Sequence, residues 1–236
     1  MTLIKSISGI RGTLENIPGE SLSDYDVKQF TLAYYSEIIS NKLKQVVVVG
    51  RDARKSGKHI SKIVSDTLVK NGCDVIDVGL VTTPTLGICT KKMNASGGIM
   101  ISASHNDEKW NALKLLNNSG EFLHPEEIQK VIKEMKRTPS NKKKQGKLSS
   151  YANALDDHIN LILSQNFINK NNIVSKSIAV AVDGINSVGG VAIPRFLESL
   201  GIKKIKKITC NPDGNFNHNP EPLPENITDL CSEVKS

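Results

Sequence analysis

The amino-acid sequence predicts an α/β protein of two domains, with mostly parallel sheets. Short β-branched runs alternate with segments whose apolar residues recur at helical spacing, which is typical of βαβ units. This order stops between residues 137 and 150, where Pro139, Gly146 and several lysines replace the apolar pattern. The order of strand, loop, helix and strand then returns, so the second half repeats the architecture of the first.

In the first half, apolar runs predict the strands, and residue spacing with end signals predicts the helices. The predicted strands are residues 46–49, 75–78 and 98–103. Four consecutive valines end at Gly50, as in a strand that is buried on both faces. A helical pattern follows, and Gly72 stands where a helix C-cap is expected. Segment 125–135 is predicted as a helix, because proline suits its first turn and Glu126 and Glu127 suit its positive end.

The second half gives similar signals. Its predicted elements are a helix at 151–163, a strand at 178–182, a glycine-bearing turn at 183–190, a helix at 191–200, a strand at 205–209 and a short helical start at 227–230. We therefore predict a first domain over 1–140, a linker over 141–150 and a second domain over 151–236. The second domain is small, which suggests that it is incomplete at its C-terminal end.

Composition excludes several classes of protein. The chain has 236 residues, of which 38% are hydrophobic and 23% charged, enough for a buried core. No apolar run approaches the roughly 20 residues of a membrane span, and residues 1–10 lack the pattern of a secretory signal. The four cysteines form no CxxC pair, which favours reduced thiols. We therefore predict a cytoplasmic protein that has no membrane partner.

The net charge of +7 fits either a nucleic-acid binder or an enzyme that handles anionic phosphates. Part of the excess lies in two lysine clusters, at 142–147 and 203–207. Aromatic residues make up only 4% of the chain and do not alternate with these lysines, so stacking on bases has little support. We predict that both clusters are solvated surface and that nucleic acid is not a partner.

Segment 98–106 is the most informative for chemistry. An apolar strand ends in the polar residues Ser104, His105 and Asn106, and ligands of open α/β sheets bind at such strand ends. A serine there can be a nucleophile or accept a phosphoryl group if something activates it, and Lys114 lies ten residues further along the chain. Taken alone, such a serine–histidine pair is more often a turn held by local hydrogen bonds.

Two further segments place cations beside glycines. In residues 50–57, between a strand and a helix, Arg51, Arg54 and backbone N–H groups could form an anion site. The alternative is a charged loop in which Asp52 pairs with an arginine. In segment 8–12, glycines flank Arg11 and allow the backbone to approach a ligand, although a simple turn is the alternative.

Together and in this order, these segments resemble the α-D-phosphohexomutase superfamily, which includes phosphoglucomutase, phosphomannomutase and phosphoglucosamine mutase. In the first half, the similar segments are Gly9–Gly12 (family GIRG), Gly50–Arg54 (GRDxR), Thr83–Thr85 (TPT), Ser102–Asn106 (the TASHN phosphoserine loop) and Asn111–Lys114 (NGxK). In the second half, they are Asp183–Asn186 (DGAN), Asn211–Phe216 (PDGxF) and Asn219–Pro222 (NPEP). More than five such segments in the family's order are not expected by chance.

The resemblance implies two three-layer α/β/α domains with mixed, mostly parallel sheets, the first of which carries the phosphoserine loop. Family members have four domains, and their third domain brings a DGDGDR-type metal loop. This sequence holds no D-x-D-x-D run, so we expect the chain to correspond to domains I and II, to be inactive alone and to have domains III and IV as partners. Asp107, Ala112 and Ser187 depart from the family's usual Pro, Gly and Gly.

The resemblance also implies a phosphohexomutase that interconverts hexose 1-phosphate and 6-phosphate through a phosphoserine and a bisphosphorylated sugar. Its catalytic residues would be Ser104, Lys114, Arg11 and His105, and its phosphate-binding residues Arg11, Ser104, His105, Asn106 and Lys114. The residues that support the site would be Arg51, Asp52, Arg54 and Asn111. Mg²⁺ would bind the phosphate oxygen on Ser104, without aspartate ligands from this chain, and a glucose 1,6-bisphosphate-type activator would prime the serine. The alternative is a non-catalytic two-domain protein that binds a sugar phosphate or a partner.

Overall fold

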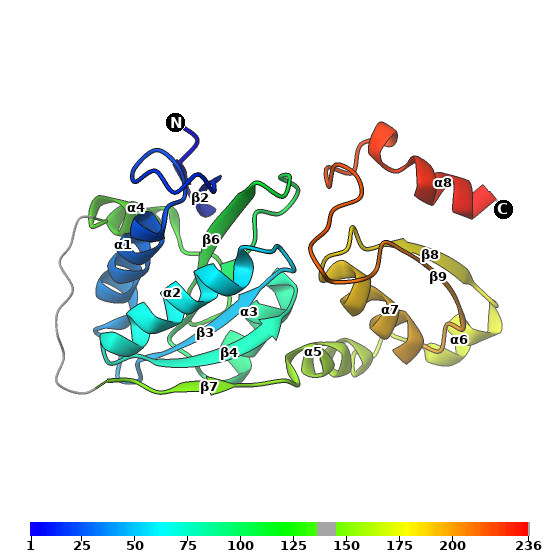
Figure 1. Ribbon diagram of the computed structural model, residues 1–236. Coiled ribbons are helices and arrows are strands. Elements are labelled where there is room, and N and C mark those ends of the chain that lie inside the picture. The colour runs from blue at the N-terminus through cyan, green and yellow to red at the C-terminus, as the bar shows by residue number, and fades with distance from the viewer. Residues whose placement is uncertain (136–144, 236) are drawn as a thin grey trace.

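The computed structural model describes residues 1–135 and 145–235, which form two α/β domains side by side (Figure 1). In the described residues, the first domain holds a seven-stranded sheet in the order β1-β2-β6-β5-β3-β4-β7. The strands are β1 (Ile4–Ser6), β2 (Gly9–Thr13), β3 (Val46–Arg51), β4 (Asp74–Leu80), β5 (Gly97–Ile101), β6 (Trp110–Leu116) and β7 (Leu148–Ser150). All of them run in one direction except β1 and β6, which confirms the prediction of a mixed, mostly parallel sheet.

Helices cover both faces of this sheet. They are α1 (Asp24–Tyr34), which continues into the π-helical turn η1 (Tyr35–Ile39), α2 (Gly57–Lys70), α3 (Thr83–Lys92) and α4 (Pro125–Lys133). Side chains alternate along β3, so Val47 and Val49 join the core that includes α1, α2 and α4. Val48 points the other way and joins Leu86 of α3 in a second core. The valine run is therefore buried on both faces, as the sequence predicts.

Strand β3 is longer than predicted. It continues through Gly50 to Arg51, so the prediction that Gly50 ends the strand is wrong. The glycine serves packing instead, because a Cβ at this position would lie 2.6 Å from Val81 Cγ2 and 3.0 Å from Leu86 Cδ1. The longer strand carries the following loop to the carboxyl edge of the sheet.

The second domain is smaller in the described residues. Its two-stranded parallel sheet pairs β8 (Ala179–Asp183) with β9 (Lys204–Ile208). Helix α7 (Gly189–Ser199) packs against both strands, and α8 (Thr228–Lys235) packs against β8. The remaining elements are α5 (Ala154–Leu163), α6 (Lys170–Ser175) and the 3₁₀ turn η2 (Pro224–Asn226). The order β8, α7, β9 matches the strand, helix and strand that the sequence predicts.

The connection between the domains carries secondary structure of its own. Residues 141–144 of the predicted linker 141–150, with their lysines, lie outside the described residues, but residues 148–150 form β7 and pair with β4. Helix α5 then packs on α3, where Thr85 Oγ1 and His158 Nδ1 are 2.9 Å apart. α5 also contacts α7, where Arg195 and Asp156 form an ion pair of 2.6 Å. α5 therefore touches both domains.

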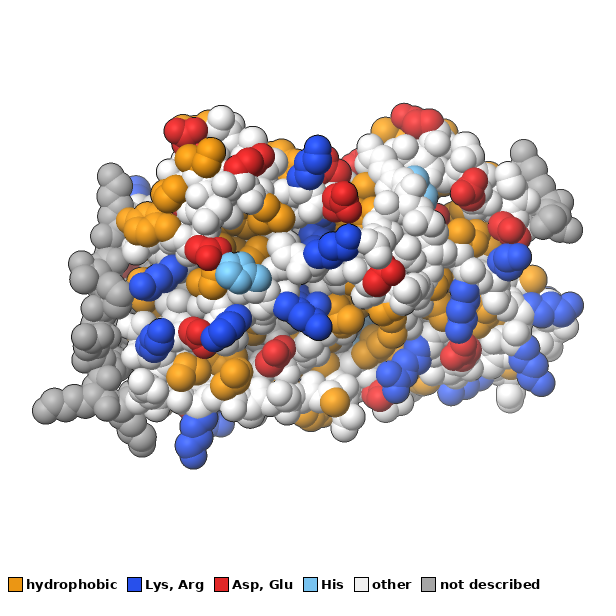
Figure 2. Space-filling view, viewed as in Figure 1, with side chains coloured by type: hydrophobic (Ala, Val, Ile, Leu, Met, Phe, Trp, Pro, Cys, Tyr) orange, Lys and Arg blue, Asp and Glu red, His pale blue; other side chains and the backbone are white. Residues whose placement is uncertain are grey.

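The surface carries charges of both signs. Figure 2 shows lysine and arginine side chains interspersed with acidic ones over the visible face. In the second lysine cluster, Lys206 and Lys207 pair with Glu233 and Glu198, at 3.2 and 3.0 Å. Among the helices that the structure describes, none has the length and apolar content that a membrane crossing needs.

Candidate functional site

The loop that follows β5 carries Ser104 at the carboxyl edge of the sheet. Ser104 is exposed, and its backbone is left-handed, with a φ of 57°. Its N–H donates to Ser102 Oγ (3.2 Å), which holds the tight turn. A left-handed backbone costs a non-glycine residue about 1–2 kcal/mol, and such strain is concentrated at functional sites. The turn presents the Ser104 side chain to solvent.

A pocket of about 210 Å³ opens beside Ser104. Three segments that are far apart in the sequence line it, with the residues Ser8, Gly9, Ile10, Arg11, Ser102, Ala103, Ser104, His105, Ala112 and Lys114. The pocket therefore contains every residue that the sequence analysis assigned to catalysis.

Strand pairing brings Arg11 and Lys114 to this pocket. β2 pairs with β6 so that Arg11 lies opposite Ala112, and Lys114 lies two residues further along the same face. Gly9 permits the close approach of the two strands. Its φ is 113°, and a Cβ there would overlap Leu113 O. The first glycine of the GIRG segment thus has a steric role beside the arginine.

Arg11 and Lys114 differ from ordinary surface cations. Arg11 Nε is buried, and among the described residues it has no hydrogen-bond partner. Because buried donors are nearly always paired, this N–H is available for an acceptor on a ligand. Burial lowers the pKa of Lys114; Asp52 opposes this effect, whereas Arg54 and Arg11 add to it. A lysine with a lowered pKa is a better proton acceptor near neutral pH.

Arg54 lies inside the protein against residues 102–110, which are called the phosphoserine loop here after the family segment that Ser102–Asn106 resembles. The residue is 2% exposed. Its Nη1 and Nη2 atoms donate to four main-chain carbonyls of the loop, those of Ser104 (3.1 Å), Asn106 (2.6 Å), Trp110 (3.0 Å) and Asp107. Its Nε donates to Asp52 Oδ2 at 3.2 Å. Burial lowers the pKa of Arg54, and the Asp52 carboxylate opposes that shift. The guanidinium is thus committed to the loop and to Asp52.

The amides and the histidine of the predicted site lie around this loop. Asn111 is buried and donates to Ser56 Oγ at 2.8 Å, which joins β6 to the start of α2. Asn106 Oδ1 is buried and, within the described residues, has no hydrogen-bond partner. His105 Nε2 lies 3.3 Å from Glu221 Oε2, which belongs to the second domain. His105 therefore lines the pocket and also contacts the other domain.

Arg51 lies apart from this pocket. Its Nη1 donates to Asp52 O at 3.2 Å, and its side chain lines a different pocket together with Lys58 and Asp77. The structure therefore brings Arg11, Ser104, His105 and Lys114 together and does not place Arg51 among them.

The second domain also contacts Ala53 and Arg54 of the first domain, through residues to which the sequence analysis assigned no site role. The Phe216 ring lies against the Arg54 guanidinium, with 5.0 Å from Cζ to the ring centroid. Ser187 Oγ accepts a hydrogen bond from the Ala53 N–H at 3.4 Å. Gly214 packs so closely that a Cβ on it would overlap Ala53 O. These residues lie in or beside segments that resemble the family, but a motif does not predict a contact between segments so far apart in the sequence.

Asp183 and His218 hold the turn that carries Phe216. Asp183 Oδ2 lies 2.8 Å from His218 Nε2, and His218 Nδ1 lies 2.9 Å from Asn219 O. Both ring nitrogens face acceptors, an arrangement that suits the doubly protonated imidazolium. Burial acts to lower the pKa of His218, but the Asn219 carbonyl and the Asp183 carboxylate outweigh it, so the pKa is raised.

This pair predicts a stability that depends on pH. Because the pKa of His218 is raised in the folded state, its contribution is complete below the unfolded value of about 6.5 and is lost as the pH rises through the folded pKa. We expect the free energy of unfolding, measured by urea denaturation, to fall as the pH rises above about 6.5. His218→Gln should flatten that dependence. The matched control is His59→Gln, which removes an exposed pair with Asp24 and should leave it unchanged. An equal slope in the His218→Gln variant would contradict the assignment.

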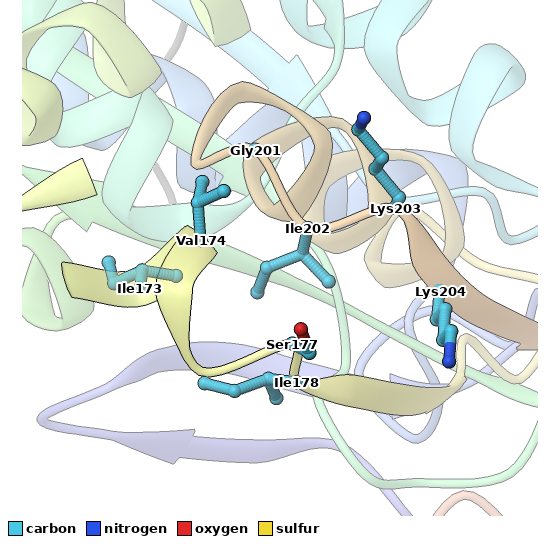
Figure 3. Close-up of a pocket in the computed structure, with 8 residues that line it drawn as sticks. All are labelled: Ile173, Val174, Ser177, Ile178, Gly201, Ile202, Lys203 and Lys204. Atoms are coloured by element: carbon cyan, nitrogen blue, oxygen red, sulfur yellow. The ribbon is translucent and has the colours of Figure 1, made fainter. Parts of the chain in front are cut away.

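A second pocket, of about 270 Å³, lies in the second domain, and Figure 3 shows the residues that line it. Its lining is mainly aliphatic with two lysines, and consists of Ile173, Val174, Ser177, Ile178, Gly201, Ile202, Lys203 and Lys204. None of the predicted site residues belongs to it. Across the described residues, His, Cys, Asp and Glu nowhere gather in groups of three or more that could hold a metal ion.

Comparison with known families agrees with this geometry. The family model described as phosphoglucomutase/phosphomannomutase α/β/α domain I matches residues 4–142, and that for domain II matches residues 156–236. A probable phosphoglucosamine mutase of Methanosphaera stadtmanae is 35% identical over 233 residues, which are 97% of this chain and 49% of the relative. A phosphomannomutase/phosphoglucomutase of Pseudomonas aeruginosa is 35% identical over 192 residues, which are 80% of this chain and 39% of the relative.

Solved structures show the same fold. A putative phosphomannomutase from Thermus thermophilus has a TM-score of 0.82 at 21% identity and covers 99% of this chain and 52% of its own. A phosphoglucomutase/phosphomannomutase family protein from Burkholderia thailandensis has a TM-score of 0.79 at 26% identity and covers 98% of this chain and 51% of its own. The chain spans about half the length of the curated relatives it matches. The resemblance found in the sequence is thereby confirmed, and the chain belongs to the α-D-phosphohexomutase superfamily, with the phosphoglucomutase/phosphomannomutase domains I and II.

Proposed function

We propose that this chain supplies the phosphoserine part of a phosphohexomutase, which interconverts hexose 1-phosphate and hexose 6-phosphate through a bisphosphorylated sugar. One observation carries the proposal. The buried Arg11 Nε has no acceptor among the described residues, and it shares a pocket with an exposed Ser104 and the half-buried Lys114. A phosphoryl group placed there would give Arg11 a charged acceptor and would lie beside a hydroxyl that can carry it.

Ser104 is the residue that carries the phosphoryl group. In the first transfer, the bond between phosphorus and Ser104 Oγ breaks, and a bond forms between phosphorus and a sugar hydroxyl oxygen. In the second transfer, a phosphoryl group from the other sugar position moves to Ser104 Oγ. Such transfers need positioning and charge neutralisation more than any other help. Two features would supply the positioning. They are the strained turn at Ser104 and the carbonyl clamp, which is the set of hydrogen bonds from Arg54 to the four carbonyls of the loop.

Lys114 handles the proton. Its lowered pKa favours the neutral amine, which can take the proton from the attacking sugar hydroxyl and release it to Ser104 Oγ as that oxygen leaves. In the second transfer, the proton returns by the same route to the sugar oxygen. Arg11 contacts the phosphoryl oxygens throughout, and His105 lines the same pocket. Asn106 belongs to the same loop, and its buried Oδ1 has no hydrogen-bond partner among the described residues. Membership of the phosphohexomutase family supports a hexose phosphate as the substrate of the proposed reaction.

Mg²⁺ would neutralise phosphate charge in such a reaction. Among the described residues, a phosphate on Ser104 would be the one ligand group, and no cluster of acidic side chains that could hold the ion accompanies it. The described residues thus do not fit a complete Mg²⁺ site, because this ion prefers an octahedral set of oxygen ligands. The proposed transfer steps therefore use only the side chains of Ser104, Lys114 and Arg11.

The test is to incubate the 236-residue chain with glucose 1,6-bisphosphate and Mg²⁺ and to map phosphate by mass spectrometry on the peptide 98–114. We expect phosphate on Ser104 and on no other serine of this peptide. We also expect the chain alone not to convert glucose 1-phosphate to glucose 6-phosphate. Phosphate elsewhere, or none under any condition, would count against the proposal. Saturable binding of the sugar phosphate without transfer would instead support a non-catalytic sugar-phosphate-binding protein.

A further inference from the structure

The guanidinium of Arg54 contacts both domains. Its five hydrogen bonds to the described residues lie along the edge of the group, four to the phosphoserine loop and one to Asp52. These partners belong to the first domain. The contact with Phe216 is different, because this residue comes from the second domain and the Arg54 Cζ lies over its ring. Phe216 and Ser104 therefore bind the same guanidinium from two domains.

The turn that carries Phe216 is itself firmly held. The N–H of Gly214 donates to Asn186 O at 3.0 Å, and Asn186 Nδ2 donates to Asn215 O at 2.8 Å. Gly214 has a φ of 75°, a conformation that favours glycine. A Cβ on this residue would overlap Ala53 O. Any side chain at this position would push the turn away from the Arg54 loop.

The contacts that run from Phe216 to Arg54 continue to Ser104. Arg54 Nη2 holds Ser104 O at 3.1 Å and Asn106 O at 2.6 Å, on both sides of His105. The left-handed backbone of Ser104 is unfavourable by itself and persists only if its surroundings hold it. A tilt of the guanidinium would lengthen these hydrogen bonds together, because the group is planar and rigid.

We propose that Phe216 is a positioning residue, which fixes the plane of Arg54 and thereby holds Ser104 in the conformation that accepts the phosphoryl group. The contact of the second domain with the GRDAR loop, residues 50–54, then determines how well Ser104 of the first domain is held in this conformation. The inference rests on the proposed function for its catalytic consequence, but the effect on the loop is independent of it. Phe216 itself stays outside the pocket and need not touch the sugar.

The loop is tested first, by hydrogen–deuterium exchange on the full chain without ligand. Phe216→Leu removes the ring, and we expect the amides of residues 104–110 to exchange about tenfold faster, as the loss of a partly buried cation–π contact implies. Phe216→Tyr keeps the ring and should restore slow exchange. Gly214→Ala keeps the phenylalanine side chain but displaces the turn that carries it, so it should reproduce the Phe216→Leu effect. Unchanged exchange at 104–110 in Phe216→Leu would overturn the proposal.

Two controls separate positioning from a loss of folding. Peptides from β8 (Ala179–Asp183) should exchange equally in all variants, and faster exchange there would assign Phe216 to the stability of its own domain and overturn the proposal. Phe167→Leu removes an exposed ring elsewhere in the second domain and should change neither region.

The catalytic consequence is tested by the rate of Ser104 phosphorylation from glucose 1,6-bisphosphate. Phe216→Leu should lower the maximal rate about tenfold and leave the concentration for half-maximal rate unchanged, and Phe216→Tyr should recover the rate. A change in the half-maximal concentration alone would overturn the positioning role. If the unaltered chain takes up no phosphate, the proposed function fails, and the exchange experiment still decides whether Phe216 orders the loop.

Discussion

Ser104→Ala is expected to abolish phosphate uptake on the phosphoserine loop, with a loss on the order of a thousandfold or more, because no other oxygen replaces the nucleophile. The fold should survive, since the side chain is exposed and the hydrogen bonds of Ser104 given above use its main chain. We expect its free energy of unfolding to stay within about 0.5 kcal/mol of the unaltered chain. Ser119→Ala, at an exposed serine in the turn after β6, is the matched control and should take up phosphate normally.

Ser104→Gly extends this experiment to the strained backbone. Glycine adopts a φ of 57° without the penalty that serine suffers, so this variant should be more stable by about 0.5–1 kcal/mol although it cannot accept phosphate. Urea denaturation measures the gain. A loss of stability in Ser104→Gly would show that the turn stores no strain at this residue.

Arg54→Met is expected to be the most destabilising single change, at about 3–5 kcal/mol, because it leaves the buried Asp52 carboxylate unpaired and removes the donor to four loop carbonyls. Arg54→Lys should cost less, about 1–3 kcal/mol, since an ammonium keeps the charge but cannot reproduce the planar fork. Urea denaturation at constant pH measures both variants.

The matched control for Arg54 is Arg195→Met. Arg195 also pairs with an aspartate, Asp156 at 2.6 Å, but both side chains are largely exposed, at 51% and 40%. Its loss should therefore cost no more than about 1 kcal/mol. If Arg54→Met cost as little as Arg195→Met, the carbonyl clamp would contribute nothing measurable to stability.

Local signals were enough to predict the central strands and most helices. The valine run of β3 and the end signals of α4 act within a few residues, and both elements form where they were expected. Helix α1 (Asp24–Tyr34) was not predicted, because its buried side includes polar residues such as Gln29 and Thr31, which obscure the apolar period. Helix α1 packs against α2 and α4, and a local sequence window does not contain this packing.

Some residues of the candidate site could likewise be predicted from local motifs, whereas others could not. Ser104, Arg11 and Lys114 were found through their motifs, and strand pairing then explains how they meet. The roles of the other residues depend on contacts between distant segments. For Arg54, the sequence-based alternative was a charged loop in which Asp52 pairs with an arginine, and the structure contains this pair. The four carbonyls that Arg54 also binds belong to a loop fifty or more residues away. Phe216 is still more remote, and only the folded chain shows it on the guanidinium.

Helix α5 has a consequence for how this polypeptide can be divided. It lies after the predicted linker, but it buries Ala154 with Cys89 and Leu86 of α3, while Leu155 and Ile159 pack with Ala192 of α7. A fragment that stops at residue 150 would lack Ala154 and expose the α3 residues that it covers. A fragment that stops at residue 163 would keep that contact but expose Leu155 and Ile159, which pack on α7. Neither cut separates the two domains without exposing apolar side chains to water.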